Sequence, residues 1–291
     1  AVAASVSVGG GSGASASLTV AVSDAQNVIQ NTTRAVIEGG SEVRSTGGAM
    51  RLDASSDGSI TATAVAASLG VSTGGGSVSL SGAGAGANAD NSITNTVEAG
   101  VLGASDAIVD GALDITATDA ASVTATVVTA AISADLGGSG SANITLSAAV
   151  SLADNSISNT VAAHVVSSGI DAGGAVTIKA DSTKAIDAVQ VAAAVAVSIG
   201  SGTVSFAGAF GVAQAQNTIG GSTTAGIFGA DIASIGGALD IDAVSGSTIN
   251  ATLVAATASV SAGSGTVSLA MSAAIALATN EISSVVLAGI D

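Results

Sequence analysis

The sequence predicts an all-β protein, an elongated β-solenoid-like array of units of about 63 residues. Three observations predict this fold. A motif recurs at a nearly fixed period, apolar and small residues alternate along the chain, and alanine, valine and glycine dominate the composition. A fixed period indicates repeats that each pack on the next, and alternation at period two is typical of β-strands.

The recurring motif has the form Asn-x-Ile-x-Asn, and its clearest copies lie in residues 90–97 and 154–161. Its leading asparagines are separated by 64, 64, 62 and 63 residues. A Gly-Ala pair at 48, 111, 174 and 237 repeats every 63 residues and supports the same period. The motif residues are Asn27, Ile29, Asn31, Asn91, Ile93, Asn95, Asn155, Ile157, Asn159, Asn217, Ile219, Asn280 and Ile282.

These landmarks predict one continuous array over residues 1–291. Its units are 1–47, 48–110, 111–173, 174–236 and 237–291, of which the first and the last are partial. Because the chain starts and stops inside a unit, we expect it to be a segment of a longer array.

Each unit is expected to hold roughly four strands, two long and two short. In the third full unit, residues 175–180 form a short strand, and alternation then runs through 188–199 and resumes at 203–212. Val189, Val191, Val195, Val197 and Ile199 share one face, which we expect to be the main packing face. The opposite face carries alanine, glutamine and serine, and is smooth enough for another layer to approach closely.

Glycine- and serine-rich turns separate the two long strands at 74–76, 137–140, 200–202 and 263–265. Such turns favour antiparallel hairpins over the alternative, a parallel β-helix with three rungs of about 21 residues per unit. At the motif the large apolar residues change from one parity to the other, as between Leu277 and Ile282. We therefore expect a bulge or corner at the asparagine.

The motif asparagines have a structural and a functional interpretation. Stacked copies could hydrogen-bond side chain to side chain in a ladder, or Asp90 and Asp154 beside them could help to bind a cation. Calcium needs six to eight oxygen ligands, and Gln216 and Thr279 replace the aspartate elsewhere, so the ladder is preferred. No cofactor is predicted, although the acidic bend with Asp110, Asp114 and Asp119 is a candidate calcium site.

Composition excludes several classes of protein. A charged content of 9% and a mean hydropathy of +0.69 exclude disorder, and zero cysteine excludes disulfides and thiol chemistry. The net charge is -16 and the five basic residues are scattered, so no nucleic acid partner is expected. Polar residues interrupt the uncharged stretch 188–230, so no membrane insertion is expected. His164 is the single histidine, and no nucleophile and base come together, so the chain is predicted not to be an enzyme.

Asn91-Ser92-Ile93-Thr94-Asn95-Thr96, followed by an apolar strand, a Gly-Gly-Ala segment and threonine-rich alternation, resembles the repeat regions of giant bacterial surface proteins. These are the filamentous-haemagglutinin-like and leukotoxin-like filamentous adhesins. The resemblance implies an extracellular or cell-surface location, a β-solenoid stalk and a role in adhesion or cell contact.

The leading functional hypothesis is therefore a structural stalk or filament segment. Its partners would be neighbouring repeats, other copies of the chain in a filament, and a cell-surface or matrix ligand. One alternative is a repetitive surface that binds a polymer, a glycan or ice through threonines, namely Thr61, Thr63, Thr116, Thr118, Thr124 and Thr126. A second alternative is a segment of an outer-membrane β-barrel.

Overall fold

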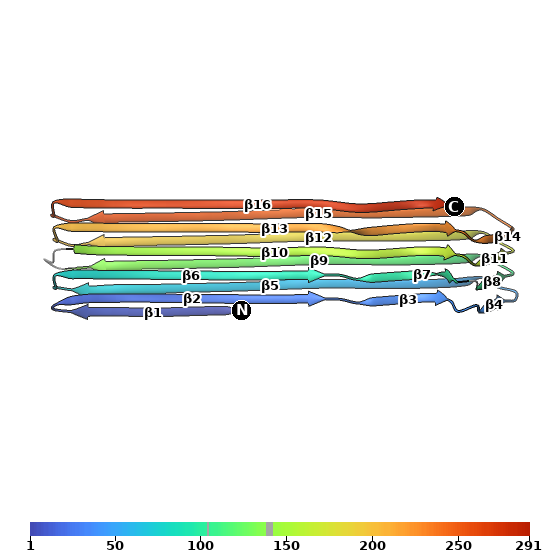
Figure 1. Ribbon diagram of the computed structural model, residues 1–291, viewed down its shortest axis with the longest axis horizontal. Helices are drawn as coiled ribbons and strands as arrows, with labels where there is room; N and C mark the ends of the chain where they lie inside the picture. The colour runs from blue at the N-terminus through green and yellow to red at the C-terminus, as the bar shows by residue number, and fades with distance from the viewer. Residues whose placement is uncertain (104, 138–141) are drawn as a thin grey trace.

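The computed structural model describes residues 1–103, 105–137 and 142–291 as strands and turns. The strands stack as a flat slab of coils, with both chain ends at opposite faces of the stack (Figure 1). No described segment is helical, so none forms a helix that could cross a membrane. The all-β prediction is confirmed.

Sheet A contains the first long strand of every coil. Its order is β1 (Val2–Gly11), β5 (Met50–Gly74), β9 (Leu113–Leu136), β12 (Val176–Ile199) and β15 (Leu239–Ala262). Every neighbouring pair is parallel.

Sheet B contains the strands that return from the turns at one end of the slab, here called the tips. Its members are β2 (Ala14–Ile29), β3 (Thr32–Ile37), β6 (Val78–Ile93), β7 (Thr96–Leu102), β10 (Ala142–Val166), β13 (Val204–Phe228) and β16 (Val267–Ile290). In the first two coils the return strand is split into two, whereas β10, β13 and β16 are continuous.

Sheet C is short and lies at the opposite end of the slab, here called the base (Figure 1). It consists of β4 (Glu42–Ser45), β8 (Asp106–Val109), β11 (Gly169–Ala172) and β14 (Asp231–Ile235). A complete coil thus has two long strands and one short strand, and the split in sheet B adds the fourth strand only near the N-terminus.

The prediction of antiparallel hairpins is wrong. The two strands that meet at a tip belong to different sheets, and each hydrogen-bonds in parallel to the equivalent strand of the next coil. The alternative of three rungs per unit is also wrong, because one 63-residue unit makes a single turn of the solenoid. A tight turn between two alternating strands is compatible with either arrangement, since sequence shows the turn but not the direction of the hydrogen bonds.

The uneven spacing of the asparagines does not affect sheet A, because it is accommodated in other parts of each coil. Equivalent residues are 63 apart throughout sheet A, but 64, 64, 62 and 63 apart in sheet B. The turns and the connections through sheet C therefore accommodate insertions and deletions of one residue. Of the turn predicted at 137–140, residues 138–140 lie outside the described residues.

Near the tips, the smooth face predicted from the sequence forms the interior. In β12 the inward residues Ala192, Ala194, Ala196 and Ser198 are buried, whereas Val189, Val195 and Ile199 point outward. The two sheets approach so closely that a side chain at Gly70 would collide with the carbonyl oxygen of Gly82. The prediction that the valine face is the main packing face is therefore wrong for this half, because the space between the sheets holds mostly small residues.

Toward the base the core becomes thicker. One cluster of buried residues is mostly alanine and lies between sheets A and B, and a second is rich in valine, isoleucine and leucine and is enclosed by all three sheets. Inward parity is unbroken across the motif, since Ile93, Asn95 and Val97 all face the interior. The pairing register is unchanged across the motif, so the predicted bulge is absent from the described strands of sheet B, but in the first two coils the strands are interrupted at residues 30–31 and 94–95. The change of parity marks the position where large side chains pass from the outer face to the inner face.

Candidate functional site

The leading asparagines of the motif form one row across all five coils, and the three inner members of the row are buried. Each amide nitrogen donates to the amide oxygen of the next coil, at 2.8–2.9 Å. The row is Asn27, Asn91, Asn155, Asn217 and Asn280, in that order. All four bonds point toward the C-terminal coil, and a chain of aligned amide dipoles polarises its members and strengthens each bond.

The motif isoleucines and the second asparagines form two further inward rows. Ile29, Ile93, Ile157, Ile219 and Ile282 are aligned in register. In the other row, the Asn159 side-chain oxygen accepts from the Asn95 backbone amide at 2.8 Å, and Asn31 donates likewise to Asn95 at 3.2 Å. This second row ends at Gly221, which aligns with Asn159.

Gly221 is linked to a buried charge on the facing sheet. Its φ is 100°, and a side chain there would collide with the Asn159 carbonyl. Lys184 reaches this region from sheet A, where it is 1% exposed, and its Nζ donates to the Gly220 carbonyl at 3.0 Å. In coil 2 the equivalent of Lys184 is Gly58, where even a Cβ would lie 2.9 Å from the Asn95 amide nitrogen. A lysine is accommodated where the opposite asparagine is missing.

Asp119 is the buried acid of the same layer. It is 1% exposed, and one of its oxygens accepts from the Asn159 amide at 2.6 Å. Burial raises the pKa of Asp119, although the Asn159 hydrogen bond and the charge of Lys184 act in the opposite direction. Burial likewise lowers the pKa of Lys184, against the effect of Asp119. The two charges thus lie in a region where each is costly without the other.

The acidic residues proposed for calcium do not converge. Asp119 faces the interior, Asp114 faces outward from the same strand, and Asp110 accepts from the Gly47 amide at 2.9 Å. Asp90 and Asp154 are stacked on the outer face of sheet B, where burial and then the charge of Asp90 raise the pKa of Asp154. In the described part of the chain, no three His, Cys, Asp or Glu side chains are grouped as metal ligands.

His164 lies on the outer face of sheet B in a small ionic network. Its Nε2 is 3.0 Å from one oxygen of Glu98, and Arg34 donates to the other oxygen at 2.7 Å. Arg34 also pairs with Glu38 at 2.8 Å. Burial raises the pKa of Glu98, but the hydrogen bonds from Arg34 and His164 outweigh it, and the pKa is lowered overall. The network connects three successive coils.

Replacing Glu98 with glutamine is expected to destabilise the protein by about 0.5–1 kcal/mol at neutral pH, the range of a partly exposed ion pair. Because the folded-state pKa is lowered, this contribution is present above the ordinary glutamate pKa and is lost as pH falls toward the folded value. Urea unfolding at several pH values checks this expectation. Glu38→Gln, which removes only the more exposed partner of Arg34, should have the smaller effect, and equal effects at all pH values would contradict the assignment.

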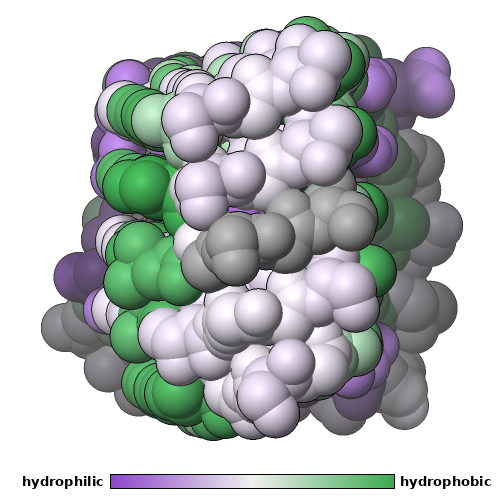
Figure 2. Space-filling model, turned by 90° about the vertical axis from the view of Figure 1, so that its left-hand side faces the viewer, coloured by the Kyte–Doolittle hydropathy of each residue, from purple (hydrophilic) through white to green (hydrophobic). Residues whose placement is uncertain are grey.

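The outer face of sheet A is divided into two chemically distinct halves. Toward the base it carries charges, namely Arg51, Asp53, Asp57, Asp114, Lys179, Asp181, Asp187, Asp240 and Asp242. Toward the tips its outward residues, in 2–10, 63–73, 126–136, 189–199 and 252–262, are uncharged and mostly aliphatic. We name this second set the aliphatic face. Figure 2, viewed onto the tips, shows hydrophobic side chains along both sides of the slab.

The corresponding part of sheet B is uneven. Gly82, Gly84 and Gly86 point outward in β6, and a Cβ on Gly86 would meet no atom within 4 Å. Shallow hollows therefore lie over β6, walled by aliphatic residues such as Leu18 and Leu146.

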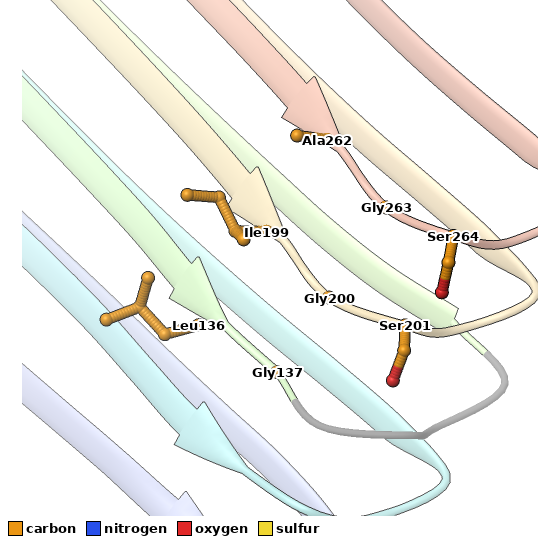
Figure 3. A pocket seen from close by; sticks show the side chains of 8 residues that line it. All are labelled: Leu136, Gly137, Ile199, Gly200, Ser201, Ala262, Gly263 and Ser264. Atoms are coloured by element: carbon orange, nitrogen blue, oxygen red, sulfur yellow. The ribbon is translucent and has the colours of Figure 1, made fainter.

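A further hollow of about 520 Å³ lies where sheet A meets the tips (Figure 3). Leu136 and Ile199 project from the ends of neighbouring strands, and Ser201 and Ser264 lie on the turns. Its lining repeats from coil to coil and includes no charged side chain. The hollow follows from the repeat, and its lining offers no acid, base or nucleophile beyond serine.

The threonines proposed as a binding surface are all on the outer face of sheet A. Thr61 and Thr63 align with Thr124 and Thr126 in the next coil, forming a two-by-two array. The array ends in the following coil at Asp187 and Val189. Thr116 and Thr118 lie apart from it, toward the base.

Sequence reasoning missed two features of this layer. Asp119 was predicted only as part of an acidic bend, and Lys184 was not recognised as a buried residue. Alignment of the copies offers a signal, because Asp119 aligns with Ser56, Ser182 and Ser245, and Lys184 with Gly58, Ala121 and Ser247. A charged residue that replaces small residues in an inward row indicates that a neighbouring buried residue has also changed.

Comparisons with protein-family models, curated proteins and solved structures found no match to this chain.

Proposed function

We propose that this chain is a structural segment of a large bacterial surface protein, a rigid solenoid stalk or filament that takes part in adhesion or cell contact outside the cell. One observation carries the proposal. Every coil pairs in register with the next through parallel strands, and the asparagine row extends through all five coils. Such a structure transmits force along its stacking axis and can be extended by adding coils.

The interior supports the same role. It is filled by small residues near the tips and by branched residues near the base. Serine hydroxyls of sheet B bond directly to the backbone of sheet A, as from Ser147 to Ala131 at 2.6 Å. A closely packed interior resists compression and suits a scaffold.

The resemblance of the motif to the repeats of filamentous adhesins supports the location and the role in cell contact. Extracellular exposure also agrees with the absence of cysteine, since a solenoid held by backbone ladders needs no disulfide. The adhesive ligand would be bound elsewhere or by the repetitive outer faces.

Single-molecule pulling from the two chain ends tests the mechanical role. Unfolding is expected in discrete steps of one coil, each releasing 63 residues or about 210 Å of extended chain. Removal of one coil breaks the bonds to its neighbour in all sheets together, so partial steps should be rare. Featureless extension at low force would exclude a load-bearing stalk.

A second candidate function rests on the threonine array on sheet A. Regular threonines on a flat sheet could order water or bind a polysaccharide. Binding of the chain to ice or to a glycan, abolished by Thr124→Val with Thr126→Val, would favour this function. Retention of binding in that variant, or no binding at all, would leave the scaffold as the better account.

A further inference from the structure

The aliphatic face consists of rows of equivalent residues that cross all coils. Two rows are invariant: one is Val2, Val65, Val128, Val191 and Val254, and the next toward the tips is Ala4, Ala67, Ala130, Ala193 and Ala256. The following row is bulkier, with Val6, Leu69, Ile132, Val195 and Ala258. These three rows therefore form a valine ridge, an alanine groove and a second, bulkier ridge, all parallel to the stacking axis.

This face is too large to be an ordinary exposed patch. With strands about 4.8 Å apart and outward positions about 6.6 Å apart, its six rows cover roughly 900 Å². The largest apolar patch of a typical monomer is about 300–600 Å², and a stable interface buries about 800 Å² on each partner. The aliphatic face matches the second value, and in the inner coils its outward side chains are half-exposed or exposed, as with Ile132 at 45% and Ile199 at 47%.

We propose that the aliphatic face is the interface of a two-fold dimer of this chain. Rows that repeat with the strand spacing fit best against a flat surface of the same spacing, which a second copy provides. A two-fold axis parallel to the stacking axis, between the alanine row and the bulkier row, places each copy's bulky ridge in the other's alanine groove. Ala130 of one copy then faces Ile132 of its partner, in the same coil.

The distribution of charge selects this orientation. Rotation about the stacking axis makes the tips of the two copies point in opposite directions, so that the acidic halves of sheet A extend away from each other. A two-fold axis along the strands would instead place acidic rows opposite acidic rows and the bulkier row opposite itself. With a net charge of -16 per chain, that second arrangement is repulsive.

Sheet B is the less suitable face for such pairing. Its outward rows mix large and absent side chains, as in Leu18, Gly82 and Leu146, so a flat partner would leave voids over β6. Voids forfeit the contacts that close packing supplies. The inference rests only on the surface shape and the charge distribution of the outer face of sheet A. It would therefore stand even if the proposed role as a stalk were wrong.

Sedimentation velocity over a wide concentration range tests the proposal. The chain should form dimers, and Ala130→Asp at the centre of the face should raise the dimer dissociation constant at least a hundredfold. Ser122→Asp is the matched control, because it places the same charge on the same strand and face but outside the overlap. Circular dichroism of each variant establishes that the fold is retained.

Thiol cross-linking tests the orientation, since the chain has no native cysteine. An equimolar mixture of Ala130→Cys and Ile132→Cys chains should cross-link faster on oxidation than either chain alone. A monomer at every concentration would overturn the proposal, as would dimers that Ala130→Asp does not weaken. Monomers that float with phospholipid vesicles through this face would also overturn it, in favour of a lipid surface.

Discussion

Replacing Lys184 with alanine is expected to lower the free energy of unfolding by about 3 kcal/mol at neutral pH. Lys184 is among the largest fully buried side chains, so truncation leaves a cavity between the sheets. The change also removes the donor to the Gly220 carbonyl and leaves Asp119 without a nearby positive charge. Urea unfolding followed by circular dichroism measures the loss.

Two further variants separate volume from charge. Lys184→Met keeps most of the volume, and we expect it to cost about 1–2 kcal/mol because Asp119 stays uncompensated. The double variant Asp119→Asn with Lys184→Met removes both charges and keeps an acceptor for the Asn159 amide. It should be at least as stable as the natural protein, since removing a buried pair of charges together is often neutral or stabilising.

The dependence on pH provides an independent check. Because burial raises the folded-state pKa of Asp119, folding takes up a proton between the ordinary aspartate pKa and the raised value, and stability falls as pH rises through that window. The deficit of Lys184→Met should therefore shrink on acidification and be absent in the double variant. A deficit in Lys184→Met that is unchanged by pH would show that the charge of Lys184 does not support Asp119.

The period, the strands and the turns could be predicted from the sequence because each has a local signature. The Asn-x-Ile-x-Asn copies and the Gly-Ala pairs show the length of a coil, and alternation shows extended chain. The direction of pairing has no such signature. Strands that meet at a tip such as Gly200-Ser201-Gly202 could pair with each other or with the next coil, and only the three-dimensional arrangement distinguishes the two.

The assignment of inside and outside failed for a related reason. Alternation in β12 separates Val195 from Ala194 but does not show which of them is buried. Burial of the larger residue is the usual expectation, yet the distance between the sheets decides here. Toward the tips the backbones are too close for most valines, and the interior takes mainly alanine, serine and glycine. The aliphatic face is the consequence, and it could not be recognised while valine was assigned to the core.

Replacing Asn155 with alanine is expected to cost about 2–3 kcal/mol, although it removes only one small side chain. Asn155 is fully buried in the middle of the asparagine row, where it accepts from Asn91 and donates to Asn217, each at 2.8 Å. Alanine leaves the Asn91 donor and the Asn217 acceptor without partners in a region that excludes water. Each unpaired buried group costs about 1–3 kcal/mol, which exceeds the net gain of an average hydrogen bond.

Asn280 provides the matched control within the same row. It lies in the last coil, is exposed, and only accepts one bond, from Asn217 at 2.9 Å. Asn280→Ala should therefore cost less than about 1 kcal/mol, because water can replace the lost partner. Urea unfolding of both variants gives the comparison. Equal losses of unfolding free energy at Asn155 and Asn280 would mean that the hydrogen bonds of the row are independent of burial. A larger loss at Asn155 would identify the row as a continuous buried element that couples neighbouring coils.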